Sequence, residues 1–206
     1  DLTFGDTRSK QSAFWTMLVL SAIIAAAGVL SDSTATVIGA MIIAPLSTPI
    51  MGMALSIAKL TPGGARTAGR FVLFGGLLVV LIGALFTVNL PGNYDLLGNP
   101  QISGRTSPGL LDLIAAVATG FAGAIAIARR DVAAVLPGVA IAISLVPPLA
   151  VVGICAGQGA FTLATGALVL FLSNILAMVM AGTLVYTTLG YSGTTAAAKG
   201  VSRRKA

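Results

Sequence analysis

The sequence lacks the residues on which most enzyme chemistry depends. It contains no histidine and no glutamate, and its acidic residues are six aspartates. Histidine and carboxylate clusters supply most acid–base groups and metal ligands, so we expect neither an enzyme nor a metal centre. The one cysteine, Cys155, cannot form an internal disulfide. No phosphate-binding loop or nucleophile–base pair is visible, and we expect no organic cofactor.

Charge is also scarce. Only 9% of the 206 residues are charged and 56% are hydrophobic, whereas soluble domains carry about 25% charged residues. A water-soluble fold of this length cannot bury so much apolar surface, so the sequence indicates an integral membrane protein whose main partner is the lipid bilayer. The net charge of +6 comes from residues between apolar runs, and we therefore expect no binding of nucleic acid.

Six apolar runs are long enough to cross a bilayer. A spanning helix needs about 17–25 residues, and backbone in lipid must satisfy its own hydrogen bonds. The prediction is an all-α, polytopic membrane protein with six transmembrane helices. The predicted spans cover residues 14–30, 36–58, 71–90, 110–128, 132–156 and 161–189. The whole chain, 1–206, then forms a single transmembrane domain.

The basic residues predict how these spans are oriented. If the N-terminus is cytoplasmic, all twelve lysines and arginines except Arg105 fall on the cytoplasmic side. Such residues are enriched in cytoplasmic loops, so we expect both termini to be cytoplasmic. The longest connection, residues 91–108, lies outside and is either a surface loop or a lid.

A weak internal repeat relates the two halves at an offset of 99 residues. The offset pairs Asp32 with Asp131, Gly39 with Gly138, and Pro49 with Pro148. Repeat one covers about residues 12–90 and repeat two about 110–190. Because each repeat has an odd number of spans, the second must enter the membrane from the opposite side. The halves are therefore predicted to be inverted repeats, an architecture of many secondary transporters.

The second and fifth spans each carry two prolines near their middle. The second reads GAMIIAPLSTPIMG over 39–52, and the fifth reads GVAIAISLVPPLAVVG over 138–153. Proline lacks an N–H and pushes the preceding residue away from helical angles, so we expect breaks at Thr48 and Val146. Paired interruptions in two halves point to a substrate site. Two structural kinks held by neighbouring helices are the alternative.

The predicted substrate site is the place where the two breaks meet. Its residues come from the second, fifth and sixth spans: Gly39, Pro45, Ser47, Thr48, Pro49, Gly138, Ser144, Pro147, Pro148 and Asn174. Asn174 either lines this cavity or bonds to a neighbouring helix. Three aspartates near span ends are candidate gate or entrance residues, or helix caps: Asp32, Asp112 and Asp131.

The absence of a carboxylate deep in any span favours an anionic or neutral substrate. Half-helix N-termini attract anions, and freed carbonyls can hold Na⁺. We therefore expect membrane transport of a small solute by alternating access. A passive channel and a non-transporting sensor or scaffold are the alternatives. Small-residue faces such as 115–124 favour close helix packing and a homo-oligomer.

Two stretches carry a resemblance to a known family. The stretch IAAAGVLSDSTATVIGAMIIAPLSTPI over 24–50, the stretch over 138–153 and Asn174 resemble a prokaryotic "uncharacterised hydrophobic domain" family, known as domain of unknown function 389. The resemblance covers nearly the whole chain and implies a protein of the prokaryotic inner (plasma) membrane. Members often carry a soluble N-terminal domain, which we expect to be missing from a chain that begins at Asp1. They often have Met-Gly where this chain has Ser47 and Thr48, which makes the predicted site more polar here.

Overall fold

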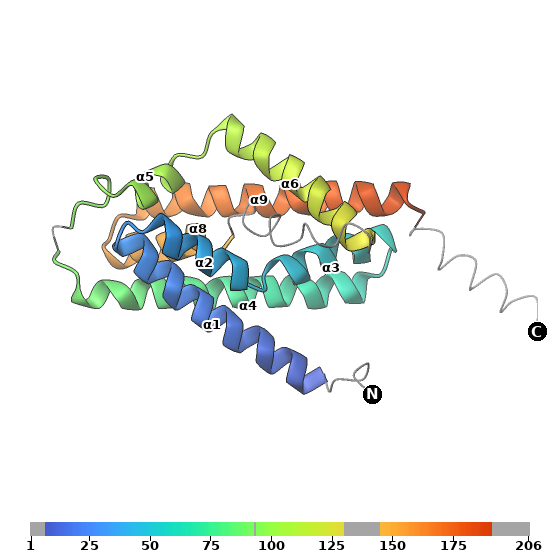
Figure 1. The fold of residues 1–206 in the computed structure, drawn as a ribbon, viewed down its shortest axis with the longest axis horizontal. Helices are drawn as coiled ribbons and strands as arrows, with labels where there is room; N and C mark the ends of the chain where they lie inside the picture. Colours follow the sequence, from blue (N-terminus) through green and yellow to red (C-terminus); the bar gives the residue numbers. More distant parts are fainter. Residues whose placement is uncertain (1–6, 93, 130–144, 191–206) are drawn as a thin grey trace, which may run out of the picture.

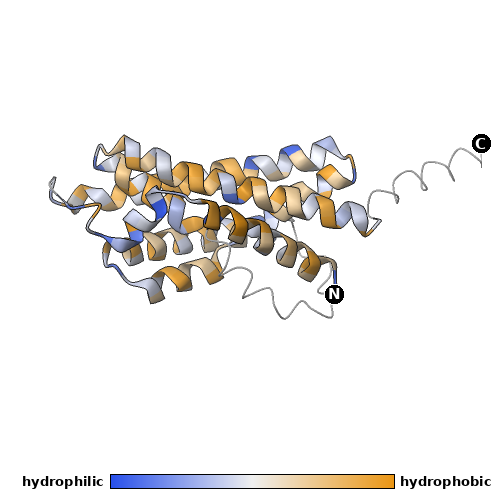
Figure 2. Ribbon diagram, turned by 90° about the horizontal axis from the view of Figure 1, so that it is seen from above, coloured by the Kyte–Doolittle hydropathy of each residue, from blue (hydrophilic) through white to orange (hydrophobic). Residues whose placement is uncertain are grey.

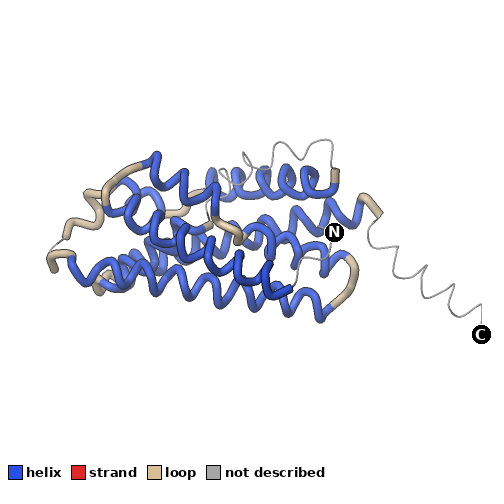
Figure 3. The backbone as a smooth tube through the Cα atoms, turned by 60° about the horizontal axis from the view of Figure 1, so that its bottom comes forward, coloured by secondary structure: helices blue, strands red, loops and turns tan. Residues whose placement is uncertain are grey.

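The computed structural model describes residues 7–92, 94–129 and 145–190. Every regular element among them is a helix, and loops join the helices (Figure 3). The elements in chain order are α1 (Thr7–Leu30), α2 (Thr34–Ile43), α3 (Ser47–Ala58), α4 (Pro62–Phe86), the 3₁₀ turn η1 (Thr87–Asn89), α5 (Pro100–Thr106), α6 (Leu110–Ala128), α8 (Val146–Gly157) and α9 (Phe161–Thr188). The prediction of an all-α protein is confirmed for this part of the chain.

Helices α1, α4, α6 and α9 are long and apolar enough to cross a bilayer, and α2 and α3 together form a bent fifth candidate. Apolar residues extend along most of their length (Figure 2), which indicates a membrane protein. Helix α6 has the predicted bounds, 110–128. Of the predicted span 132–156, residues 132–144 lie outside the described ranges, so the count of six spans stays a prediction.

Helices α3 and α8 form the centre of the bundle. Both pack between α4 and α9, while α1 covers α2, α4 and α8, and α6 covers α9. Figure 1 shows α3 in the half of the bundle where α4 begins, and α8 in the opposite half. Helix α8 is apolar on every face, and ten consecutive residues from Val146 to Cys155 are buried, as expected of a core helix.

The two ends of the bundle differ in charge. We call one end the basic end; it holds the start of α1, the α3–α4 turn and the end of α6 (Figure 1). The basic side chains that the structure describes there are those of Lys10, Lys59, Arg66, Arg70 and Arg129. The opposite end, which we call the α5 end, holds the α1–α2 turn, η1, α5 and the α8–α9 turn. Of the described basic residues, only Arg105 lies there.

Candidate functional site

The second span breaks between Ile43 and Ser47, and α2 and α3 meet there at a bend of 47°. Ala44 precedes Pro45 and has an extended backbone (φ −68°, ψ 121°), the conformation that a following proline imposes. The break therefore differs from the predicted position at Thr48, which lies in the first turn of α3. The third residue of α3 is a proline, but N–H groups of a first turn have no helical partner, so its missing N–H costs little.

A side chain of α1 satisfies one carbonyl at the break. The hydroxyl of Ser21 donates to Ala40 O at 2.8 Å, and both residues are fully buried. The carbonyls of a last helical turn are short of helical donors, and Ala40 lies in the last turn of α2. The sequence analysis missed Ser21, whose signal was a lone hydroxyl within the apolar run 14–30.

A pocket of about 560 Å³ lies beside the break and reaches the α3–α4 turn at the basic end. Its lining comes from α1, α3 and α4: Lys10, Gln11, Phe14, Thr48, Pro49, Gly52, Ser56, Gly63, Gly64, Thr67, Ala68 and Phe71. Thr48 and Pro49 belong to the predicted site. Pro45 and Ser47 are half-buried beside them in the chain and are not part of the lining. The contribution of α1 was not predicted.

The polar groups of this pocket are hydrogen-bond donors and hydroxyls. Lys10 and Gln11 are exposed, as is Thr48. The hydroxyls of Ser56 and Thr67 donate to carbonyls of their own helices at 2.8 and 3.0 Å, and their oxygens can still accept. Among the described residues that line it, none is acidic. The pocket is therefore electrostatically suited to an anion or a neutral polar solute.

An aromatic cluster closes one wall of the pocket. The rings of Phe14 and Phe71 meet edge to face with centroids 5.3 Å apart, and Trp15 stacks on Phe71 at 5.9 Å. Both arrangements are favourable aromatic geometries. The cluster fixes the start of α1 against α4 and so holds the α1 side of the pocket in place.

The second proline pair stands at the start of α8. This helix begins at Val146, where the break is predicted, and Pro147 and Pro148 occupy its first turn. Both prolines are buried and neither lines the pocket. They have no N–H to offer a ligand, so this half-helix start brings fewer donors than the start of α3.

Helices α3 and α8 nevertheless begin at the same level of the bundle. A Cβ built on Gly75 of α4 would lie 3.1 Å from Leu46 Cδ2, just before α3, and a Cβ built on Gly76 would lie 3.7 Å from Leu149 Cδ1 in α8. Successive helical residues differ by only about 1.5 Å along the axis. The starts of α3 and α8 therefore both face the middle of α4.

The remaining predicted site residues lie apart from the pocket. Gly39 is half-buried on α2, with no atom within 4 Å of a built Cβ. Asn174 is buried midway along α9 and is not part of the lining. Gly138, Ser144 and Asp131 lie outside the described residues.

Of the two described entrance candidates, Asp32 lies in a turn and Asp112 caps a helix. Asp32 lies in the α1–α2 turn at a positive φ of 50°, and Ser33 caps α2 through a bond from Thr36 N at 3.3 Å. Asp112 accepts a bond from Gly109 N at 2.8 Å at the start of α6, which is the half of a capping box that the N3 side chain supplies. Within the described ranges, no three His, Cys, Asp or Glu side chains come together that could hold a metal ion.

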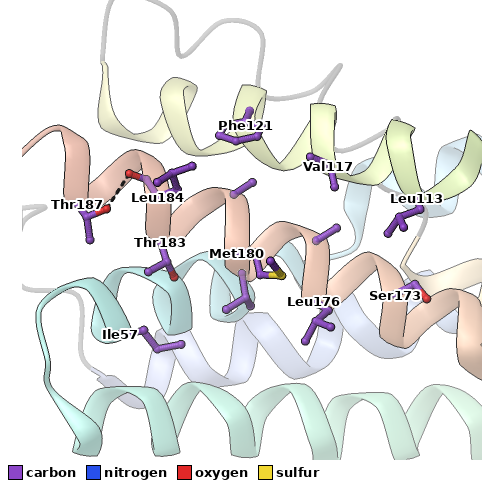
Figure 4. Close-up of a pocket in the computed structure, with 13 residues that line it drawn as sticks. Ile57, Leu113, Val117, Phe121, Ser173, Leu176, Met180, Thr183, Leu184 and Thr187 are labelled. Atoms are coloured by element: carbon purple, nitrogen blue, oxygen red, sulfur yellow. Dashed lines mark hydrogen bonds between the residues drawn. The ribbon is translucent and has the colours of Figure 1, made fainter. Parts of the chain in front are cut away.

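A larger groove of about 980 Å³ runs between α3, α6 and α9 (Figure 4). Its lining is largely apolar, and its hydroxyls belong to Ser173, Thr183 and Thr187. Each donates to a backbone carbonyl, at 2.8, 3.4 and 2.8 Å respectively. The groove therefore suits apolar chains better than a polar solute, and we take the smaller pocket as the candidate site.

Comparisons with known proteins identify a family and one relative. Residues 41–180 match a family described as a domain of unknown function (DUF389). The chain is 34% identical over 176 residues to an uncharacterised protein, MJ0678, of Methanocaldococcus jannaschii. The alignment covers 85% of this chain and 54% of the relative, so the chain spans about half the length of that curated protein. No solved structure matches the chain.

Proposed function

We propose that this chain, which belongs to the DUF389 family, transports a small anionic or neutral solute by alternating access around its two half-helix starts. The observation that carries the proposal is that α3 and α8 both begin against the middle of α4, with a pocket that holds Lys10 and several hydroxyls leading to the start of α3. Interrupted helices at the bilayer midplane form the substrate sites of many secondary transporters.

The observed helix bounds support an inverted repeat. Shifting α3 (Ser47–Ala58) by 99 residues gives the bounds of α8 (Val146–Gly157), and the same shift moves the start of α4 onto the start of α9. In Figure 1, α3 runs from the middle of the bundle to the basic end, whereas α8 runs from the middle to the α5 end. Opposite directions are what an inverted repeat requires.

Close helix crossings support the same relation. Helices α4 and α8 cross where a Cβ built on Gly83 would lie 3.2 Å from Gly153 Cα. The 99-residue offset pairs Gly83 with Gly182 and Ala54 with Gly153. A Cβ built on Gly182 would lie 2.9 Å from Ala54 Cβ, so α9 crosses α3 at the corresponding place.

The charge distribution supports a topology with the basic end in the cytoplasm. Five of the six basic side chains that the structure describes belong to elements at that end, and cytoplasmic loops are enriched in such residues. We propose that the protein resides in a prokaryotic inner (plasma) membrane with both termini cytoplasmic. The pocket would then open to the cytoplasm, where Lys10 attracts anions.

A closed inner end favours a transporter over a passive channel. Beyond the pocket, the fully buried Leu46 and Ile50 join Leu149 in one apolar cluster between the two half-helix starts. A site that is open to one side and closed to the other is the arrangement that alternating access needs. A channel or a non-transporting sensor or scaffold is distinguished by the experiment below.

Three further expectations complete the proposal. We propose that no covalent chemistry accompanies transport. We also propose that Na⁺ can bind at the break in the second span, because Pro45 has no N–H and the carbonyl of Met41 therefore loses its helical donor. We also propose a homo-oligomer, with the groove between α3, α6 and α9 as the candidate contact (Figure 4). Chemical cross-linking in membranes tests the last point.

Solute flux in proteoliposomes tests the proposal. The probes are chloride, phosphate, acetate, succinate, urea and glycerol. We expect saturable uptake of at least one probe, accelerated when the same solute is present on the opposite side. Thr48→Val removes one exposed hydroxyl of the pocket and should slow this uptake by roughly tenfold, the value of about one hydrogen bond.

The matched control is Thr165→Val. Thr165 is exposed on α9, and its hydroxyl donates to Thr162 O of the same helix at 2.7 Å, so flux should be unchanged. Uptake without saturation or acceleration from the opposite side would indicate a channel. A folded protein that moves none of the probes, and whose Thr48→Val and Thr165→Val variants are indistinguishable, would refute the proposal and favour a scaffold.

A further inference from the structure

We infer that α5 is a gate that closes a second route to the same site from the α5 end of the bundle. The inference rests on the proposed function and adds the part of the chain that would have to move. It starts from the pocket at the basic end, which has a counterpart in the second half of the chain.

The 99-residue offset identifies that counterpart. It pairs Ser56 and Thr67 of the pocket with Cys155 of α8 and Gly166 of α9. Ser56 is half-buried and Thr67 exposed, whereas Cys155 is fully buried. The two halves therefore differ in exposure at corresponding positions. These positions line an open pocket at the basic end, whereas the counterpart of Ser56 at the α5 end is buried.

Helix α5 fills this place. Ile102 is fully buried and belongs to the same apolar cluster as Cys155. The carbonyl of Thr106 lies so close to Gly166 that a Cβ there would clash with it. The first half has a threonine at the corresponding position, Thr67, which is exposed among the residues that the structure describes. Gly166 is thus the residue that allows α5 to sit on α9.

Two side-chain hydrogen bonds join α5 and its N-cap to the end of α1 and the start of α2. Asn99 Nδ2 donates to Val29 O at 2.8 Å, and Gln101 Nε2 donates to Thr34 Oγ1 at 2.9 Å. Arg105 donates to Gln101 O at 2.6 Å and to its Oε1 at 3.0 Å. Burial lowers the pKa of the Arg105 guanidinium, which still stays protonated. A helix of seven residues that is held by two polar bonds to the rest of the bundle and by its packing on α8 and α9 can leave as a unit. Arg105 would then place a positive charge at the mouth of an anion route.

The native cysteine makes the gate testable, because Cys155 is the chain's only thiol. The probe is a sulfonate-bearing methanethiosulfonate, an anion that does not cross membranes, applied to the α5 side of membranes holding the full chain. When α5 recloses faster than the reagent reacts, the labelling rate is proportional to the open population. We expect slow labelling of the wild type.

Two variants should speed labelling. Thr34→Val removes one bond to α5 without changing α5 itself, and we expect roughly tenfold faster labelling. Gly166→Ala places a Cβ against the Thr106 carbonyl and should speed labelling at least as much. Gly104→Ala is the matched control: it lies on α5 with no atom within 4 Å of a built Cβ, and labelling should equal that of the wild type.

Labelling of folded Thr34→Val and Gly166→Ala proteins that is as slow as in the wild type would overturn the gate. Labelling of Cys155 in the wild type that is as fast as labelling at position 107 in Ser107→Cys, an exposed site, would overturn it as well. If Gly166→Ala does not fold, Thr34→Val decides alone. The gate and the transport function can fail separately. Faster labelling in a protein that moves no solute leaves the gate standing and refutes transport, whereas solute flux with unchanged labelling does the reverse.

Discussion

Replacing Gly153 by alanine should push α4 and α8 apart. A Cβ at this position would clash with Val80 O and would lie 2.8 Å from Ala84 N and 3.0 Å from Gly83 Cα. Carbon atoms usually pack at about 3.5–4.0 Å. All three obstacles are backbone atoms, which cannot rotate aside as a flexible side chain would. One helix must therefore shift against the other.

The cost follows from two opposing terms. Overpacking a core costs about 1–3 kcal/mol, and a clash with three backbone atoms belongs at the upper end. Alanine regains about 1 kcal/mol over glycine as a helix former. The expected net loss is about 2 kcal/mol, and for a chain of this length each kcal/mol lowers the Tm by about 2–4 °C. The Tm should fall by about 4–8 °C.

Thermal unfolding in detergent, followed by circular dichroism, measures this effect. The scan rate must be constant across variants, because irreversible unfolding makes the midpoint depend on it. The matched control is Gly39→Ala in α2, where no atom lies within 4 Å of a built Cβ, and its Tm should stay constant or rise. Equal midpoints for the Gly153→Ala and Gly39→Ala proteins would refute the close crossing.

Three further predictions concern the site and its supports. Ser21→Ala leaves the buried Ala40 carbonyl without its side-chain donor and should cost about 1–3 kcal/mol in the same thermal assay. Lys10→Gln should slow uptake of anionic probes more at low than at high salt, because screening weakens the attraction of the native lysine; uptake of neutral probes should be unchanged. Asp112→Ala removes the side-chain bond to Gly109 N and should cost about 1 kcal/mol, again read from the Tm.

Local sequence signals predicted much of the fold. The apolar run 110–128 matches α6 because its length and its flanking Pro and Arg residues mark both ends. The prolines marked the interruption of the second span because their effect on the chain is local. The exact break moved from Thr48 to residues 44–46 because Pro49 fits the first turn of a helix and Pro45 does not fit the end of one.

Contacts between distant segments could not be predicted in this way. Lys10 and Gln11 line the pocket only because the start of α1 leans against α4 through the aromatic cluster. The connection 91–108 has the composition of a surface loop, yet Ile102 is fully buried. Its burial depends on Gly166, more than sixty residues later in the chain. A glycine within an apolar run does not indicate which distant segment will pack against it.

The first turns of α3 and α8 differ in the number of hydrogen-bonding groups that they can offer to a solute. Ser47 and Thr48 begin α3 and bring two hydroxyls, while the backbone N–H of Thr48 already donates to Pro45 O at 3.3 Å. Val146, Pro147 and Pro148 begin α8 and bring one N–H group. An anion held by half-helix N-termini would therefore be bound mainly by α3, while α8 supplies an apolar wall. Substitutions in the first turn of α3 should consequently alter the apparent affinity for the solute, whereas substitutions in the first turn of α8 should alter packing and stability.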